Sequence, residues 1–212
     1  MKFSYIQDPT PALLELMERL ERQILWRPRP DMPLADRIYR FAEGILGVKE
    51  LEYLGKTQSG LLPERIRLLA EFVLGNIEKR YAIPSGDTQI PVRVRNCRRE
   101  ILKVFQDQHS ADRQQASLDL DDLFMVIQLF SYPGDYVAAK PSLERMAETL
   151  DKFEEDILRA PTAAIRGSRR AIIAFGESVN VEPDSNKKQG AAMLTEKLEH
   201  AVQTMLDQIG SV

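Results

Sequence analysis

The chain has 212 residues, of which 43% are hydrophobic and 29% charged, a composition typical of a folded globular protein rather than a disordered or fibrous one. Its 29 Lys and Arg residues against 32 Asp and Glu residues give a formal charge of −3, which disfavours general nucleic-acid binding. One cysteine and two histidines exclude an internal disulfide framework and a Cys-rich zinc site, so we expect no metal site and no cofactor.

The N-terminal segment lacks the basic start and apolar stretch of a secretory signal. The longest nearly apolar run, Leu123–Phe130, is about a third of the length that a bilayer crossing needs. We therefore expect a cytoplasmic protein, and peripheral contact with the inner face of a membrane stays open. The length allows one domain or two. Because no repeat of fixed period emerges, we expect a single helical domain over 1–212.

Six segments before residue 160 carry apolar residues at three- and four-residue spacing, which predicts amphipathic helices that form one bundle over 10–159. The segments are Thr10–Trp26, Leu34–Leu54, Pro63–Tyr81, Pro91–Gln106, Leu118–Ser131 and Ser142–Arg159. Thr10 is predicted to cap the first helix and Gly55 to end the second.

The fifth helix has an apolar composition almost all round, from Leu123 to Phe130, which predicts that other helices enclose it. The polar stretch Gln106–Ser117 before it is predicted to be a loop. Asp119, Asp121 and Asp122 would then lie in the first turn, where the helix dipole favours anions. Tyr132–Asp135 is predicted to form a turn, with Gly134 at positive φ.

Two short segments favour strands instead. Lys2–Ile6 alternates with period two, and Ala171–Val181 is β-branched and interrupted by Gly176. Strands need partners, so we expect these two to pair with each other across the bundle. After the polar linker Glu182–Gln189, a last helix is predicted over 190–210. The expected fold class is mostly α, a multi-helix bundle with a minor two-stranded β element formed by the N-terminal and late segments.

Two basic runs are the candidate anion-binding sites. Arginines cluster on the fourth predicted helix and again before the second strand, and guanidinium groups suit phosphate or carboxylate ligands. The residues are Arg93, Arg95, Arg98, Arg99, Arg166, Arg169 and Arg170. The alternative is a solvated face that pairs with acidic helices.

The remaining candidates favour structural roles. Glu144, Glu148, Asp151 and Glu155 form a stripe that could serve a di-metal bundle, but the Glu-x-x-His ligand pair of such sites is absent. Cys97 shares an apolar helix face with Val94, Ile101 and Phe105, which favours a buried thiol over a nucleophile. His109 lies in a polar stretch, and His200 follows Glu196 by four residues, an ordinary exposed pairing. No catalytic residue is assigned.

The order of segments resembles the helical C-terminal part of bacterial phospholipid/glycerol acyltransferases. The resemblance is carried by Lys2–Ile6, Asp8–Pro11, Leu51–Gly55, Ser131–Tyr136, Phe153–Asp156 and Ile173–Val179. It implies that the first segment is a late strand of the acyltransferase domain and that the Phe-Gly-Glu segment closes it. The family's catalytic pair is a His followed five residues later by Asp, whereas here Gln114 follows His109 and Met205 follows His200 at that spacing.

The resemblance therefore implies a non-catalytic helical region that positions or regulates an acyltransferase core in lipid metabolism. The expected partners are such a core or another protein, with weak contact to anionic lipid, and no nucleic acid. The alternative is a stand-alone helical interaction module with no lipid role. An enzyme using Cys97 is a third, more distant reading.

Overall fold

The computed structural model describes residues 2–84, 89–106, 112–139, 141–181 and 187–210. It is mostly helical, with one small antiparallel sheet, as the sequence predicts. The elements in chain order are β1 (Lys2–Tyr5), α1 (Thr10–Gln23), α2 (Leu34–Leu54), α3 (Leu62–Arg80), α4 (Ile90–Gln106), α5 (Arg113–Ser131), α6 (Tyr136–Ala139), α7 (Leu143–Ile157), β2 (Arg169–Ile172) and α8 (Lys187–Gly210).

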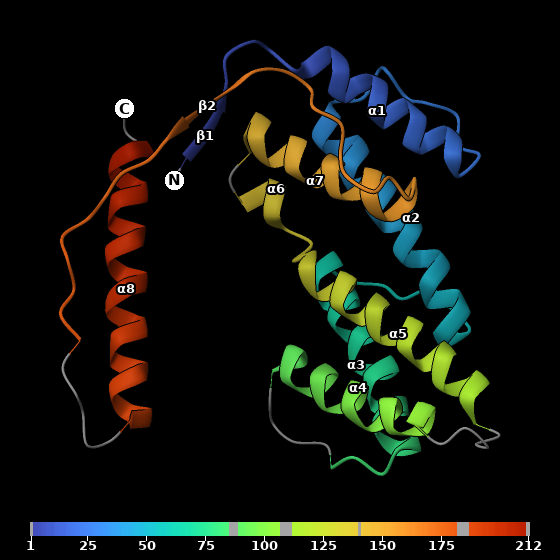
Figure 1. Ribbon diagram of the computed structural model, residues 1–212. Coiled ribbons are helices and arrows are strands. Elements are labelled where there is room, and N and C mark those ends of the chain that lie inside the picture. The colour runs from blue at the N-terminus through green and yellow to red at the C-terminus, as the bar shows by residue number, and fades with distance from the viewer. Residues whose placement is uncertain (1, 85–88, 107–111, 140, 182–186, 211–212) are drawn as a thin grey trace.

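Helices α1 to α7 form a bundle with two hydrophobic cores that share α2 (Figure 1). The first core packs α1 and α7 against the N-terminal half of α2, around the buried side chains of Leu16, Phe41 and Leu150. The second core packs α3, α4 and α5 against the C-terminal half of α2, around Leu74 and Ile101 among others. Helix α2 is therefore the element that joins the two halves of the bundle.

Buried ion pairs tie neighbouring helices together. Arg37 of α2 and Glu21 of α1 are both fully buried, with Nη2 and Oε2 2.6 Å apart. Glu50 of α2 accepts two hydrogen bonds of 2.8 Å from Arg65 of α3 and one from the Gln58 N–H. Burial alone would raise the pKa of Glu50, but these bonds hold it below its usual value. Such pairs fix which helix faces meet, because a buried carboxylate needs its partner.

The predicted cap of helix α1 is wrong, whereas the predicted end of α2 at Gly55 and the predicted positive φ at Gly134 are confirmed. Thr10 is already helical and does not cap; instead Asp8 Oδ1 accepts from the Thr10 N–H at 3.0 Å and from its hydroxyl at 2.6 Å. Gly55 ends α2 in the left-handed region at φ +72°. Gly134 has φ +85°, and a Cβ there would lie 2.9 Å from the Pro63 nitrogen, so both conformation and space demand glycine.

Helix α5 is longer and less enclosed than predicted. It begins at Arg113, so the predicted loop is wrong for 113–117, while 107–111 lie outside the described residues. The periodicity misses this turn because only Ala116 in it is buried. Asp119 is consequently not in the first turn. The expectation of an enclosed helix is also wrong, since Phe124 is 64% and Phe130 51% exposed.

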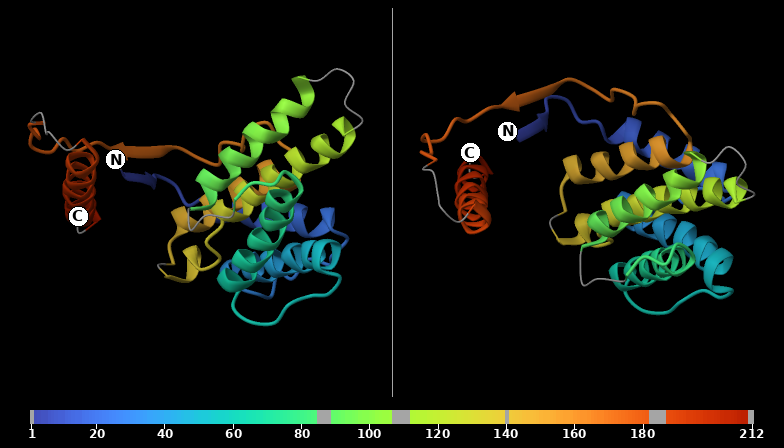
Figure 2. Two further views of the ribbon diagram at one scale, coloured as in Figure 1. Left: turned by 90° about the horizontal axis from the view of Figure 1, so that it is seen from below. Right: turned by 60° about the horizontal axis from the view of Figure 1, so that its bottom comes forward.

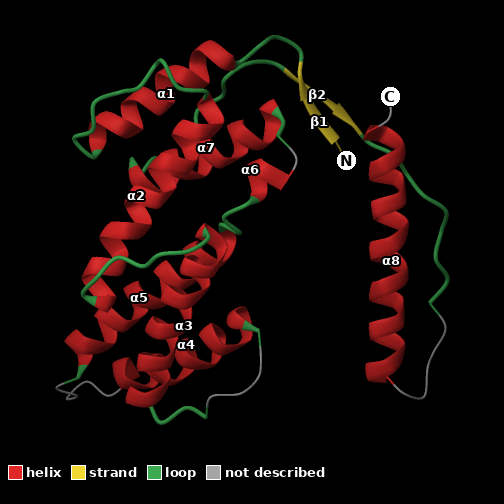
Figure 3. Ribbon diagram, turned by 180° about the vertical axis from the view of Figure 1, so that it is seen from behind, coloured by secondary structure: helices red, strands yellow, loops and turns green. Residues whose placement is uncertain are grey.

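The two strands pair antiparallel, with Lys2 opposite Ile172 and Tyr5 opposite Arg169, which confirms the predicted pairing across the bundle. The second strand is shorter than predicted and shifted: it spans Arg169–Ile172, and 173–181 forms no strand. Helix α8 begins at Lys187, within the predicted linker. We call β1, β2, the segment 173–181 and α8 the arm. In Figures 1, 2 and 3, α8 stands apart from the bundle beyond the two strands.

Within the described residues, the helices lack the combination of length and apolar content that a bilayer crossing requires.

Candidate functional site

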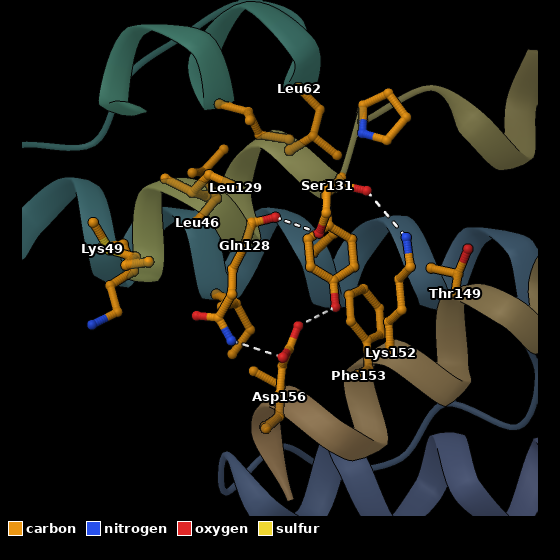
Figure 4. Close-up of a pocket in the computed structure, with 18 of the residues that line it drawn as sticks. Leu46, Lys49, Leu62, Gln128, Leu129, Ser131, Thr149, Lys152, Phe153 and Asp156 are labelled. Carbon is orange, nitrogen blue, oxygen red and sulfur yellow. Dashed lines mark hydrogen bonds between the residues drawn. The ribbon is translucent and has the colours of Figure 1, made fainter. Parts of the chain in front are cut away.

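A cavity of about 730 Å³ lies in the bundle between α2, α5 and α7. It sits where the first and second cores meet, and the connection 131–134 that leads from α5 to α6 forms part of its lining; Figure 4 shows side chains that line it. Its wall is mainly apolar, with Ile38 and Leu46 from α2, Met125 from α5 and Phe153 from α7. The size falls within the range of ordinary small-molecule sites, which are likewise mostly apolar with a few polar groups.

Three tyrosine–carboxylate hydrogen bonds surround this cavity. Each joins two different elements or turns: Tyr53 to Asp122 at 2.5 Å, Tyr132 to Asp156 at 2.6 Å and Tyr136 to Glu148 at 2.6 Å. Burial, reinforced by the carboxylate, raises the pKa of Tyr53 and of Tyr132. The hydroxyls therefore stay protonated and donate at neutral pH.

Asp156 accepts a hydrogen bond on each of its two carboxylate oxygens. Its two oxygens accept from Tyr132 and, at 2.7 Å, from Gln128 Nε2, so α7 is tied to α5 across the cavity (Figure 4). Tyr132 stacks on Phe153 with ring centroids 5.5 Å apart. Lys152 donates to the Ser131 carbonyl oxygen at 3.2 Å. These contacts hold the polar end of the cavity in one geometry.

The net charge of the lining is negative. Five carboxylates and three basic side chains line the cavity, and the basic ones are Lys49, Lys152 and Arg159. Lys49 pairs with Glu52 at 2.8 Å. Among the described residues, Asp122, Glu148 and Asp156 form no ion pair; their hydrogen bonds come from neutral donors. Burial raises the pKa of Asp122, against the opposing effect of the Tyr53 hydrogen bond.

In the basic run of α4, one arginine forms ion pairs with another helix and three are exposed to solvent. Arg93 is largely buried and forms ion pairs with Glu78 at 2.8 Å and Glu71 at 2.6 Å, both on α3. Arg95 and Arg98 are exposed and take part in no ion pair within the described part of the chain, and exposed Arg99 reaches only its neighbour Glu100. Of the four arginines in this run on α4, Arg95, Arg98 and Arg99 thus present their guanidinium groups to solvent.

The second basic run meets the acidic stripe of α7. Arg166 is 5% exposed and forms ion pairs with Asp151 and Glu154, and Arg169 reaches Asp151 at 3.4 Å and the Tyr5 hydroxyl at 2.7 Å. Arg170 is exposed on β2. The structure thus keeps the two arginine runs on different elements, and each run has members that pair with acid: Arg93 with α3, and Arg166 and Arg169 with α7.

The remaining candidates are accounted for structurally. Cys97 is fully buried in the second core, and burial raises the pKa of its thiol to about 11. His200 is exposed on α8 and forms no ion pair with Glu196, whereas His109 lies outside the described residues. In the ranges that the structure describes, no group of three or more His, Cys, Asp or Glu side chains is arranged to hold a metal ion.

The arm is the second feature that stands out, because it exposes apolar side chains. Phe175 is 93%, Ile173 60% and Phe3 47% exposed, and every residue of β2 is exposed. On α8, Met193 is 63% and Val202 49% exposed. The helix touches 173–181 where Met205 lies against Gly176, so close that a Cβ there would be 3.0 Å from its sulfur.

Sequence reasoning missed the cavity and its tyrosines. Two of the tyrosines lie in the Tyr132–Tyr136 segment, but their partner carboxylates are 24 and 12 positions away, and the partner of Tyr53 is 69 positions away. Comparisons with protein-family models, curated proteins and solved structures gave no match.

Proposed function

We propose that this chain is a non-catalytic helical region that packs on an acyltransferase core and positions or regulates it in lipid metabolism. The observation that carries the proposal is the pairing of the two strands in the arm. The chain enters the bundle after β1 and leaves it before β2, so one two-stranded ribbon holds both ends of the bundle. This arrangement fits an insertion between neighbouring strands of a larger sheet. The resemblance to acyltransferases implies a closing strand at the Phe-Gly-Glu segment, which directly follows β2.

A two-stranded ribbon is marginally stable by itself, and its open edges are ready templates for further strands. Here the ribbon also carries exposed apolar side chains, including Phe3 and Ile172. A sheet edge of the core would pair with the ribbon and cover these side chains, as in strand addition between proteins. The chain itself lacks the family's His-x4-Asp pair, so acyl transfer is assigned to the core, and the chain works at the inner face of a membrane in the cytoplasm.

The test uses acyltransferase cores that carry the His-x4-Asp pair and come from the same genome as this chain. We expect the purified chain alone to transfer no acyl group to lysophospholipid or glycerol phosphate. We expect one of these cores to bind the chain in calorimetric titration. We also expect the acyl-transfer rate of that core to change when the chain is added.

The ribbon variant Phe3→Asp should abolish this binding, while the control Phe124→Asp, which alters an even more exposed phenylalanine on α5, should leave it intact. Binding to none of the cores, or binding that Phe3→Asp leaves unchanged, would overturn the proposal.

The second candidate, a stand-alone helical interaction module without a lipid role, is favoured by one observation, the exposed apolar residues Met193, Leu198 and Val202 of α8. In that case Leu198→Asp would remove binding of a protein partner and Phe3→Asp would not. The pair of variants therefore separates the two functions.

A further inference from the structure

The cavity between α2, α5 and α7 is a candidate ligand site, because it combines a mostly apolar wall with several carboxylates. It lies within the bundle, away from the arm, so what it binds is independent of the function proposed above. Apolar residues from both cores form most of its wall, and carboxylates lie at its polar end. A ligand that fits must therefore bring an apolar part and a group that suits carboxylates.

We propose that this cavity binds a small amphipathic cation, its apolar part against the wall formed by α2 and α5 and its ammonium group beside Asp156. Asp156 accepts one hydrogen bond on each oxygen, and each carboxylate oxygen has a second acceptor site. Both donors are neutral, so the negative charge of Asp156 is not compensated by them. The Tyr132 ring itself is already engaged, stacked on Phe153 and with the Lys152 ammonium 5.5 Å from its centroid, so the site for the ligand's ammonium is the Asp156 carboxylate.

The electrostatics of the lining favour a cation over an anion. Of the three basic lining side chains, Lys49 is paired with Glu52, Lys152 donates to the Ser131 carbonyl oxygen and lies over the Tyr132 ring, and Arg159 is exposed to solvent. Asp122 and Glu148 add negative charge that no described basic side chain pairs with. In a low-dielectric cavity this excess attracts an ammonium group and repels a carboxylate. Figure 4 shows Lys49 directed away from Asp156, whereas Asp156 is directed toward Gln128.

The first experiment compares three probes of one chain length, octylammonium, octanol and octanoate, by calorimetric titration of the full chain below their micelle concentrations. We expect octylammonium to bind at least about tenfold more tightly than octanoate, with octanol between them. Shortening the chain should weaken binding about fourfold per methylene, the effect of about 0.8 kcal/mol of apolar burial. Equal or tighter binding of octanoate, or no binding of any probe at millimolar concentration, would refute the proposal.

The second experiment changes the charges. Asp156→Asn should weaken octylammonium binding about tenfold, and Asp122→Asn should weaken it less. The control Asp36→Asn, at an exposed aspartate of α2 outside the cavity, should have no effect. Lys152→Gln should tighten binding of the cation because a like charge is removed; weaker binding would instead point to an anionic ligand and contradict the proposal.

The third experiment needs no variant and locates the probe. The methyl resonance of Met125, which lines the cavity, should shift when octylammonium is added, whereas that of exposed Met193 on α8 should not. A shift confined to Met193 would place the probe on the arm and overturn the proposal.

Discussion

The bundle and the arm are built from similar amphipathic sequences, and they differ in what their apolar residues contact. In α1, Leu13, Leu16 and Leu20 are at most 2% exposed, packed against α2 and α7. In α8, Leu198 has the same spacing to its apolar neighbours but is 44% exposed. An amphipathic pattern therefore specifies that a face will be covered, but it does not specify by what. The arm is the part of the molecule where the covering element is still to be identified.

The largest contrast should come from the buried charges of the bundle. Arg37→Leu leaves Glu21 buried without its bidentate partner and should lower the free energy of unfolding by about 3–5 kcal/mol in urea titration. The matched change Arg170→Leu on exposed β2 should alter it by less than about 0.5 kcal/mol. A loss below about 1 kcal/mol for Arg37→Leu would show that the contrast between bundle and arm is weaker than described.

Truncating one leucine in each region tests the apolar contacts directly. Leu20→Ala in α1 should cost about 2–5 kcal/mol, because it removes a fully buried side chain and leaves a cavity. Leu198→Ala in α8 should cost less than about 1 kcal/mol in the isolated chain. Thermal and urea unfolding measure both. Equal losses would mean that α8 is as firmly packed as α1.

A third, smaller contrast concerns pH. Burial raises the pKa of Asp122 in the folded bundle, so the folded state holds its proton more tightly than the unfolded state does. Asp122 thus favours folding at low pH, and that contribution is lost as pH rises from the unfolded pKa through the folded one. Asp122→Asn keeps an acceptor for Tyr53 and should raise the melting temperature at pH 7 more than at pH 4. The α8 control Glu199→Gln should not change the pH profile, and a rise equal at both pH values would rule out this account.

The smallest effect on stability is expected for the solvent-exposed arginines of α4. Charge reversal of Arg95 and Arg99 to Glu should change the melting temperature by an amount near the error of the measurement, because both side chains are exposed and Arg99 contacts only Glu100. The matched reversal Arg166→Glu should destabilise, since Arg166 is buried against Asp151 and Glu154.

The same variants address the lipid expectation. In co-sedimentation with anionic vesicles the wild-type chain should bind weakly and release with added salt, and the Arg95/Arg99 reversal should remove that binding. Equal, negligible sedimentation with anionic and neutral vesicles would exclude direct membrane contact through this face.

Much of this fold could be predicted from local sequence. Helix α2 has the predicted bounds and α3 and α4 agree within one residue, because long periodic segments bounded by Pro or Gly carry a strong signal. The pairing of the two strands was also predictable, since each needed a partner. The start of α5 was not, because Ala116 is the only buried residue in its added turn 113–117, so no apolar periodicity marks that turn.

The candidate sites were harder to predict for the same reason. Cys97 could be assigned to the core from its helix face alone. The roles of Arg93 and Arg166 depend on acidic partners on other helices, and the cavity depends on how two cores meet along α2. Periodicity reports which side of a helix is apolar, whereas these features arise from contacts between residues distant in sequence.

The ribbon also bears on the order in which the chain folds. Tyr5 and Arg169 are 164 positions apart, so their contact closes one of the longest loops that this chain can make. The helical pairs α4–α5 and α1–α2 join neighbours in sequence and should form first, drawing the chain ends together before the strands can pair. In pulsed hydrogen exchange during refolding, we expect the amides of β1 and β2 to gain protection last; protection ahead of α4 and α5 would contradict this order. Pairing of β1 with β2 would then be the last step of folding, after the helices have packed.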